Sequence, residues 1–223
     1  MKTGYWGLRR RLQCAMGLCM LLLAGAVQAQ AAPGMAQDAA APRTVLVMGD
    51  SLSAAYGLRA DEGWVALLAE RIAEEHPQWR VVNASISGET SAGGSSRVVG
   101  EVLRHRPDVV VIALGANDAL RGLPLSALKY NLARMIGASG HVGARVLLVG
   151  MRMPPNLGPE YTLGFERTYR ELAGFFDIQL LPFLLEPVAA DRGNFLDDNL
   201  HPTAAAQPAI SDHVWQALEP MLR

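Results

Sequence analysis

Ser51 is the residue in this sequence best placed to act as a nucleophile. It follows an unbroken apolar run, Val45–Met48, through the short segment Gly49-Asp50. Such a run is typical of a strand that is buried on both faces, as in a parallel sheet. Ser51 would then lie at the carboxyl end of that strand, where open α/β sheets bind ligands. A helix cap is the alternative and fits equally well at this point, because Asp and Ser are favoured N-caps.

A base for such a serine is available near the end of the chain. His201 lies three residues after Asp198, and a neutral imidazole can accept a proton near pH 7. On a helical turn this spacing places both side chains on one face, so that the carboxylate can orient the ring. Taken alone, Asp198 is also an ordinary helix N-cap, and an isolated His before Pro commonly has no catalytic role. Together with Ser51 the pair predicts a Ser-His-Asp triad.

Two further loops supply candidate donors for a negatively charged oxygen. Gly88 follows the second expected strand, and its lack of a side chain lets its N–H approach a substrate closely. Asn117 follows the most hydrophobic segment of the chain and carries a neutral amide donor. With the N–H of Ser51 they would form an oxyanion hole. Each of the two residues alone is more often a turn or loop stabiliser.

The four segments that carry these residues resemble the four sequence blocks of the SGNH, or GDSL, hydrolase family. Within it, the bacterial periplasmic subfamily of acyl-CoA thioesterase I, lysophospholipase L1 and arylesterases is the most similar, over essentially the whole chain after the first 29 residues. The resemblance implies Ser51, Asp198 and His201 as catalytic triad, and Ser51, Gly88 and Asn117 as oxyanion hole. One departure is Ala116, where relatives often have Gly. The resemblance rests on Gly49-Asp50-Ser51-Leu52, Gly88, Gly115-Ala116-Asn117-Asp118 and Asp198-Asn199-Leu200-His201.

Alternating strand and helix patterns position these residues. Right-handed crossovers between such strands give a parallel sheet covered on both faces. We therefore predict an α/β fold, a three-layer α/β/α sandwich with a five-stranded parallel sheet of flavodoxin-like form. Gly140 is expected just past the end of the third helix, and one helical turn near Leu185. The expected strands are 44–48, 79–83, 108–114, 145–149 and 178–181, and the expected helices are 64–75, 91–105, 125–138, 160–175 and 203–218.

The loop after the fourth strand is expected to bind the acyl group of a substrate. Met153, Pro154 and Leu157 would give it an apolar lining, in which a thioether adapts to an irregular chain. Asp50 and Leu52, on either side of Ser51, are also expected to contact substrate. Two alternatives remain: the loop residues only cap the core, or the acyl groove lies beside residues 120–123.

The first 29 residues read as a secretory signal peptide. A basic start with Lys2 precedes an apolar run of about 14 residues and a small-residue cleavage site, and that run is shorter than a membrane span requires. Residues 30–42 read as a flexible lead-in, and residues 43–223 as one hydrolase domain. We thus expect an exported, periplasmic or secreted, protein without a stable membrane anchor. Both cysteines, Cys14 and Cys19, lie in the signal, so the exported chain would form no disulfide.

Composition narrows the classes of function. After residue 29 the chain has 16 basic and 21 acidic side chains, a formal charge of −5, which gives no footprint for nucleic acid. No metal-ligand spacing occurs, and the chemistry needs no cofactor. We predict a monomeric serine ester hydrolase acting on small acyl esters, thioesters or lysophospholipids. The alternatives are an acyltransferase or carbohydrate deacetylase on the same fold, or a non-catalytic flavodoxin-like binding domain with Asp50 or Asp118 in an acidic pocket.

Overall fold

A five-stranded, all-parallel sheet forms the centre of the protein in the computed structural model, which describes residues 42–223. The spatial order is β2-β1-β3-β4-β5, so the chain first moves outward from β1 to β2 and then returns to the other side of β1. This reversal lies between β1 and β3, where doubly wound sheets bind ligands. The strands are β1 (Arg43–Gly49), β2 (Trp79–Asn83), β3 (Val109–Ala113), β4 (Arg145–Val149) and β5 (Gln179–Leu181).

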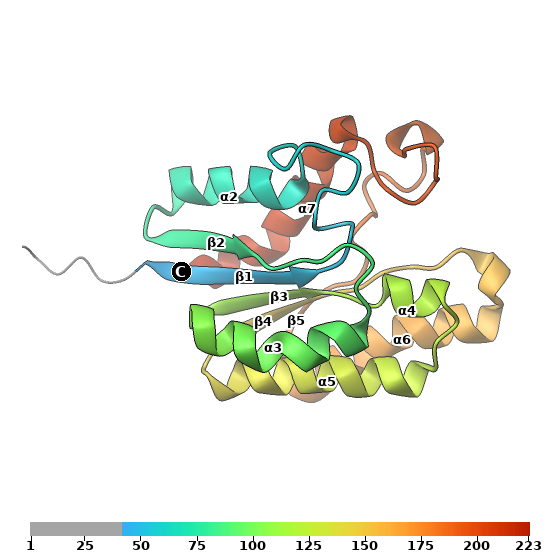
Figure 1. Ribbon diagram of the computed structural model, residues 1–223, viewed down its shortest axis with the longest axis horizontal. Helices are drawn as coiled ribbons and strands as arrows, with labels where there is room; N and C mark the ends of the chain where they lie inside the picture. The colour runs from blue at the N-terminus through green and yellow to red at the C-terminus, as the bar shows by residue number, and fades with distance from the viewer. Residues whose placement is uncertain (1–41) are drawn as a thin grey trace, which may run out of the picture. The chain divides into compact units, whose positions relative to one another are not determined.

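Helices cover both faces of the sheet (Figure 1). Helices α2 and α7 lie on one face, and α3, α5 and α6 lie on the other. The α-helices are α2 (Trp64–Glu75), α3 (Ser91–His105), α4 (Ala116–Leu120), α5 (Leu125–His141), α6 (Pro159–Phe176) and α7 (Gln207–Leu218). Short 3-10 turns are η1 (Pro155–Leu157), η2 (Arg192–Asn194), η3 (Ala204–Ala206) and η4 (Glu219–Leu222).

The central strands are buried on both faces, which explains their unbroken apolar sequences. In β1, Val45 and Val47 pack into the core beneath α2 and α7. The intervening Leu46 and Met48 pack into the opposite core beneath α3, α5 and α6. All four side chains are fully buried. Strand β1 therefore holds the turn that follows it rigidly between two cores.

The expected three-layer α/β/α fold is confirmed, with local differences in its helices. Residues after Gly115 form the short helix α4 instead of a loop. Helix α5 continues to His141, so Gly140 lies inside it, and Gly143 takes the left-handed conformation (φ 81°) after its end. The expected helical turn near Leu185 is present: the N–H groups of Val188 and Ala189 donate to the Leu185 carbonyl at 3.0 and 2.9 Å. The last helix starts as 3-10 turn η3 before α7.

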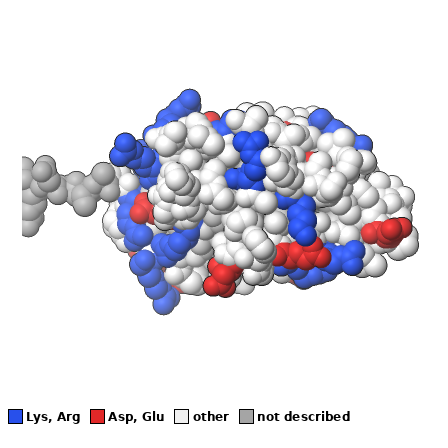
Figure 2. Space-filling view, turned by 90° about the horizontal axis from the view of Figure 1, so that it is seen from below, with Lys and Arg blue, Asp and Glu red and all other residues white. Residues whose placement is uncertain are grey.

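The predicted signal peptide, residues 1–29, and all but the last residue of the predicted lead-in, 30–42, lie outside the described residues. Within residues 42–223, no helix combines the length and apolar character needed to cross a bilayer. The face seen in Figure 2, on the side of α3 and α5, carries basic side chains in separate groups with acidic side chains among them. Its charge is therefore mixed.

Candidate active site

Ser51 lies in a tight turn directly after β1. The N–H groups of Ser53 and Ala54 both donate to the Asp50 carbonyl, at 3.1 and 3.0 Å, and the Asp50 carboxylate accepts the N–H of Leu52 at 3.0 Å. The turn needs glycine at position 49, because a Cβ there would lie 2.5 Å from the Ser53 hydroxyl oxygen. Helix α2 begins only at Trp64, so Ser51 caps no α-helix and its hydroxyl is available.

His201 joins Ser51 to Asp198 through two short hydrogen bonds. His201 Nε2 lies 2.8 Å from Ser51 Oγ, and Nδ1 lies 2.6 Å from Asp198 Oδ2. The other carboxylate oxygen accepts the N–H groups of Leu200 and His201, at 2.9 and 3.0 Å. The His201 N–H is the largest cause that lowers the pKa of Asp198 to about 2, followed by the imidazole and the Leu200 N–H. Asp198 is therefore charged over the whole neutral range and can orient the ring.

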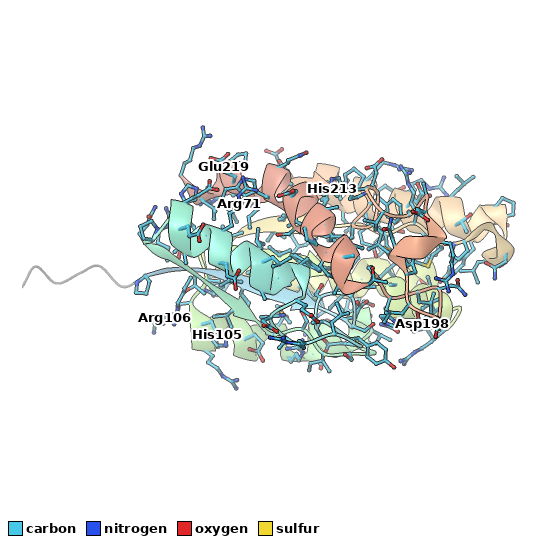
Figure 3. All side chains as sticks on the ribbon, turned by 90° about the horizontal axis from the view of Figure 1, so that it is seen from above. Arg71, His105, Arg106, Asp198, His213 and Glu219 are labelled. Atoms are coloured by element: carbon cyan, nitrogen blue, oxygen red, sulfur yellow. The ribbon has the colours of Figure 1, made fainter. Side chains whose placement is uncertain are left out.

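The segment that carries Asp198 and His201 is a turn and not the helical turn that the sequence suggested. Asn199 takes the left-handed conformation, with φ 59°, and the turn is held by the Asp198 carboxylate. The N–H of Leu196 also donates to the His201 carbonyl at 2.8 Å. Figure 3 shows Asp198 at the opposite end of the molecule from Arg106, which follows α3, and so at the carboxyl ends of the strands.

Tyr56 is a contact that sequence reasoning missed. Its ring is half-exposed and lies 4.4 Å, centroid to centroid, from the imidazole of His201. The aromatic ring covers one face of the imidazole and restricts its rotation. Nothing in the sequence around position 56 distinguishes this tyrosine from an ordinary loop residue.

Two backbone amides near Ser51 are free to bind an anion. The N–H groups of Ser51 and Gly88 donate to no group among residues 42–223. Gly88 has φ 79°, a conformation that is strained for any residue with a side chain. Its carbonyl, which belongs to the following peptide group, accepts from Arg121 Nη2 at 2.9 Å, so Gly88 is held on its carboxyl side. These amides can stabilise a negatively charged oxygen.

Asn117 comes from the next strand of the sheet, as the second residue of α4. Its Nδ2 lies 3.1 Å from the Glu89 carbonyl and 3.3 Å from Asp50 Oδ2. Both partners are acceptors, so they select the orientation in which the nitrogen, and not the oxygen, faces the Gly88 loop. The preceding Gly115 has φ 127°, and a Cβ there would lie 2.1 Å from the Tyr169 hydroxyl.

Asp50 lies beneath the turn rather than on an open surface, with 2% of its area exposed. Burial raises its pKa to about 6, against the lowering effects of the Leu52 N–H, His201 and Asn117. The sequence suggested Asp50 as a substrate contact. It lines the cavity beside Ser51, and its hydrogen bonds also make it a support for Asn117 and for the turn that carries Ser51.

A cavity of about 400 Å³ opens beside Ser51 and His201. Of the expected substrate contacts, Leu52, Met153 and Pro154 line it, and Asp50 lies at its floor. Leu157 does not line it and packs against the core beneath α5 and α6. Ala116, the departure from the family pattern, is part of the wall. Leu120, from the alternative position beside residues 120–123, also lines it. Other apolar walls that sequence reasoning did not assign to it are Phe183, Leu185, Phe195 and Leu200.

Within residues 42–223, no three His, Cys, Asp or Glu side chains are grouped so that they could hold a metal ion. The groups at the cavity are instead a hydroxyl, an imidazole and a carboxylate in a line, with free N–H donors nearby. This set is suited to acyl transfer through a covalent intermediate.

Comparisons with known proteins identify the family of this chain. Residues 47–208 match the GDSL-like lipase/acylhydrolase family. Esterase TesA of Pseudomonas aeruginosa is 48% identical over 183 residues, which are 82% of this chain and 91% of that protein. Thioesterase 1/protease 1/lysophospholipase L1 of Escherichia coli K12 is 39% identical over 184 residues, 82% of this chain and 87% of the relative. A crystal structure of TesA superposes with a TM-score of 0.78 at 47% identity, covering 80% of this chain and 99% of the other. The chain therefore belongs to the GDSL-like lipase/acylhydrolase family.

Proposed function

We propose that this protein hydrolyses acyl esters and thioesters through an acyl-enzyme on Ser51, with His201 as base and Asp198 as its orienting carboxylate. The observation that carries the proposal is the continuous hydrogen-bonded line from Ser51 Oγ through His201 to Asp198, at 2.8 and 2.6 Å, beside an apolar cavity. The names of the relatives, esterase and thioesterase 1/lysophospholipase L1, support the same class of reaction.

The mechanism follows from the positions of the protons. His201 Nε2 takes the proton of Ser51 as Oγ attacks the acyl carbon, and Asp198 stabilises the imidazolium that forms. The carbonyl oxygen becomes an oxyanion that the N–H groups of Ser51 and Gly88 stabilise. Asn117 joins them when one Nδ2 hydrogen turns from the Asp50 carboxylate, its longer contact at 3.3 Å, to the oxyanion, while the other stays on the Glu89 carbonyl. His201 then gives its proton to the leaving alcohol or thiol. Water, deprotonated by the same ring, releases the acid and restores Ser51.

The cavity supports an acyl chain rather than a charged group as the part of the substrate bound beside Ser51. Its walls are mainly aliphatic and aromatic, and Met153 adds an adaptable thioether. Among the described residues, Arg152 is the one Lys or Arg side chain at its lining, and it is about half-exposed. Small-molecule esters and thioesters with an apolar acyl group are therefore the proposed substrates.

A hydrolysis panel tests this proposal. Acetyl, octanoyl and palmitoyl groups are each presented as an aryl ester, a CoA thioester and a lysophospholipid, with and without glycerol as acceptor. Release of free acid from several leaving groups is the expected result. Acyl glycerol as the main product would make the protein a transferase, and activity confined to acetylated sugars would make it a carbohydrate deacetylase.

Export is part of the proposal and rests on the sequence of residues 1–29. The exported enzyme would begin near Gln30 to Ala32, act without a membrane anchor and be a monomer. Mass spectrometry of protein recovered outside the cytoplasm is the test, combined with the molar mass from light scattering. An intact Met1 on that protein would contradict cleavage.

A further inference from the structure

The loop between β2 and α3, residues 84–90, needs support because it presents the Gly88 N–H at an exposed position. Ser87 and Gly88 are exposed, and the neighbouring Ile86 is 50% exposed. Near its tip, the loop is tied to β1 by the Ile86 N–H, which donates to the Gly49 carbonyl at 3.0 Å. A donor placed about 1 Å from its proper position loses much of its effect on a transition state.

Arg97, in the second turn of α3, holds this loop at both ends. Its Nε donates to Glu89 Oε1 at 2.7 Å, and its Nη2 donates to Glu89 Oε2 at 2.5 Å. Nη2 also donates to the carbonyl of Ala84, the first residue of the loop, at 2.5 Å. A planar guanidinium can make this set of bonds, whereas the single ammonium of lysine cannot reproduce the two parallel bonds.

The pair is shielded from solvent, so its geometry is strongly determined. The Glu89 side chain is 6% exposed and that of Arg97 is 21% exposed. The hydrogen bonds to Glu89 are the largest cause that raises the pKa of Arg97 above its usual value. Removing Arg97 would leave the poorly solvated Glu89 carboxylate without this partner, and the loop would move to solvate it. Removing Glu89 would leave Arg97 with Glu101, at 3.5 Å, but with no ion pair to the loop.

Glu89 links this pair to the proposed oxyanion hole in two ways. It directly follows Gly88, and its carbonyl accepts the Nδ2 of Asn117 at 3.1 Å. Arg97 itself does not line the cavity and would not touch a substrate. We propose that Arg97 is a positioning residue that holds, through Glu89, both the Gly88 N–H and the Asn117 amide in place for the oxyanion. This inference rests on the proposed function of Ser51.

Arg97→Lys is the variant that tests the inference, because it keeps the charge and removes the fork. We expect kcat on an acetyl aryl ester to fall about ten- to hundredfold, less than the 10²–10³-fold typical of losing a whole oxyanion donor. KM should stay within about threefold, because ground-state binding is untouched. Arg43→Lys is the matched control: it alters an Arg–Asp pair at the amino end of β1 and should leave kcat within about twofold.

A double-mutant comparison separates positioning from general destabilisation. In an Asn117→Ala background, the logarithm of the loss in kcat caused by Arg97→Lys should be about half of its value in wild type, because one of the two targets of Arg97 is gone. Fully additive losses, an effect on KM alone, or kcat within threefold of wild type in folded protein would overturn the inference. Should Arg97→Lys not fold, Glu89→Gln gives the same reading: a loss in kcat supports the inference, and an unchanged kcat overturns it.

Different results would contradict the proposed function and this inference. Hydrolysis retained by Ser51→Ala would contradict the proposed function itself. An inactive Ser51→Ala together with an unaffected Arg97→Lys would overturn only the positioning role of Arg97.

Discussion

Asp50→Asn removes a charge that the fold buries at a cost, and it should change stability and catalysis in opposite directions. Asp50 is almost fully buried, and burial raises its pKa to about 6. The folded protein therefore binds a proton on Asp50 more tightly than the unfolded chain does. As pH rises from about 4 to about 6, the unfolded chain ionises first, and the folded state loses stability relative to it.

The size of this effect follows from the shift. An unfolded aspartate titrates near pH 4, so a rise to about 6 corresponds to about 3 kcal/mol of stability lost between pH 4 and pH 7. Asn cannot titrate, so this contribution disappears in the variant. The pKa of Asp198 is instead lowered to about 2, so its contribution to stability is present above the unfolded pKa near 4 and is lost only as pH falls toward 2. It therefore stays nearly constant between pH 4 and pH 7.

Catalysis should suffer because Asn presents an NH₂ group where the Asp50 carboxylate accepts from Asn117. The 3.3 Å contact is then lost, and the Asn117 amide is held by the Glu89 carbonyl alone. A hydrogen bond to a charged acceptor contributes about 1.5–3 kcal/mol. Because this contact is long, we expect a value at the lower end of that range. We expect kcat to fall about tenfold, with KM little changed.

Urea unfolding of wild type and Asp50→Asn from pH 4 to pH 8 measures the effect on stability. The contributions of all other titrating groups cancel in the difference between the two free energies of unfolding. The stability of wild type relative to Asp50→Asn should fall by about 3 kcal/mol across that range. A difference that stays constant with pH would refute the reasoning about Asp50, whatever its absolute value.

Two further variants test the donors and the cavity. Asn117→Ala should lower kcat on the order of 10²–10³-fold with little change in KM, measured on an aryl ester; a change in KM alone would make Asn117 a ground-state contact. Phe195→Ala should lower kcat/KM for octanoyl esters about ten- to hundredfold and for acetyl esters less than threefold, since each buried methylene contributes about 0.8 kcal/mol. Leu157→Ala is its control, because Leu157 lies outside the cavity, and it should lower kcat/KM equally for octanoyl and acetyl esters. A larger loss for octanoyl than for acetyl esters in Leu157→Ala, but not in Phe195→Ala, would show that the acyl chain binds near Leu157.

The sheet and the site loops could be predicted because they depend on strong local signals. A short apolar run rich in β-branched residues, such as Val109–Ala113, favours a strand buried on both faces, and parallel strands bring their carboxyl ends to one edge. Ser51 and Asn117 follow neighbouring strands, β1 and β3, so their proximity follows from the topology alone. Asp198 and His201 meet as expected, although a turn and not a helix joins them.

Other parts of the site depend on tertiary contacts that carry no local pattern. The cavity walls Phe183 and Phe195 lie in the irregular segment between β5 and α7. In this segment the hydrophobic residues follow neither the period of two of a strand nor the period of 3.6 of a helix, so the sequence does not indicate which way they face. Leu157 has the right hydrophobicity for the cavity but faces the core instead. The Arg97–Glu89 pair spans eight residues across a helix start, a spacing that no helical rule selects.

The central claim, a covalent mechanism on Ser51, is tested most directly by intact-mass analysis after reaction with a fluorophosphonate. Wild type should gain one phosphonyl group, mapped to the peptide that contains Ser51, and lose its esterase activity in the same proportion. Ser51→Ala should stay folded, take up no label and hydrolyse esters at background rate. Labelling at another residue, or activity of folded Ser51→Ala within tenfold of wild type, would contradict the account.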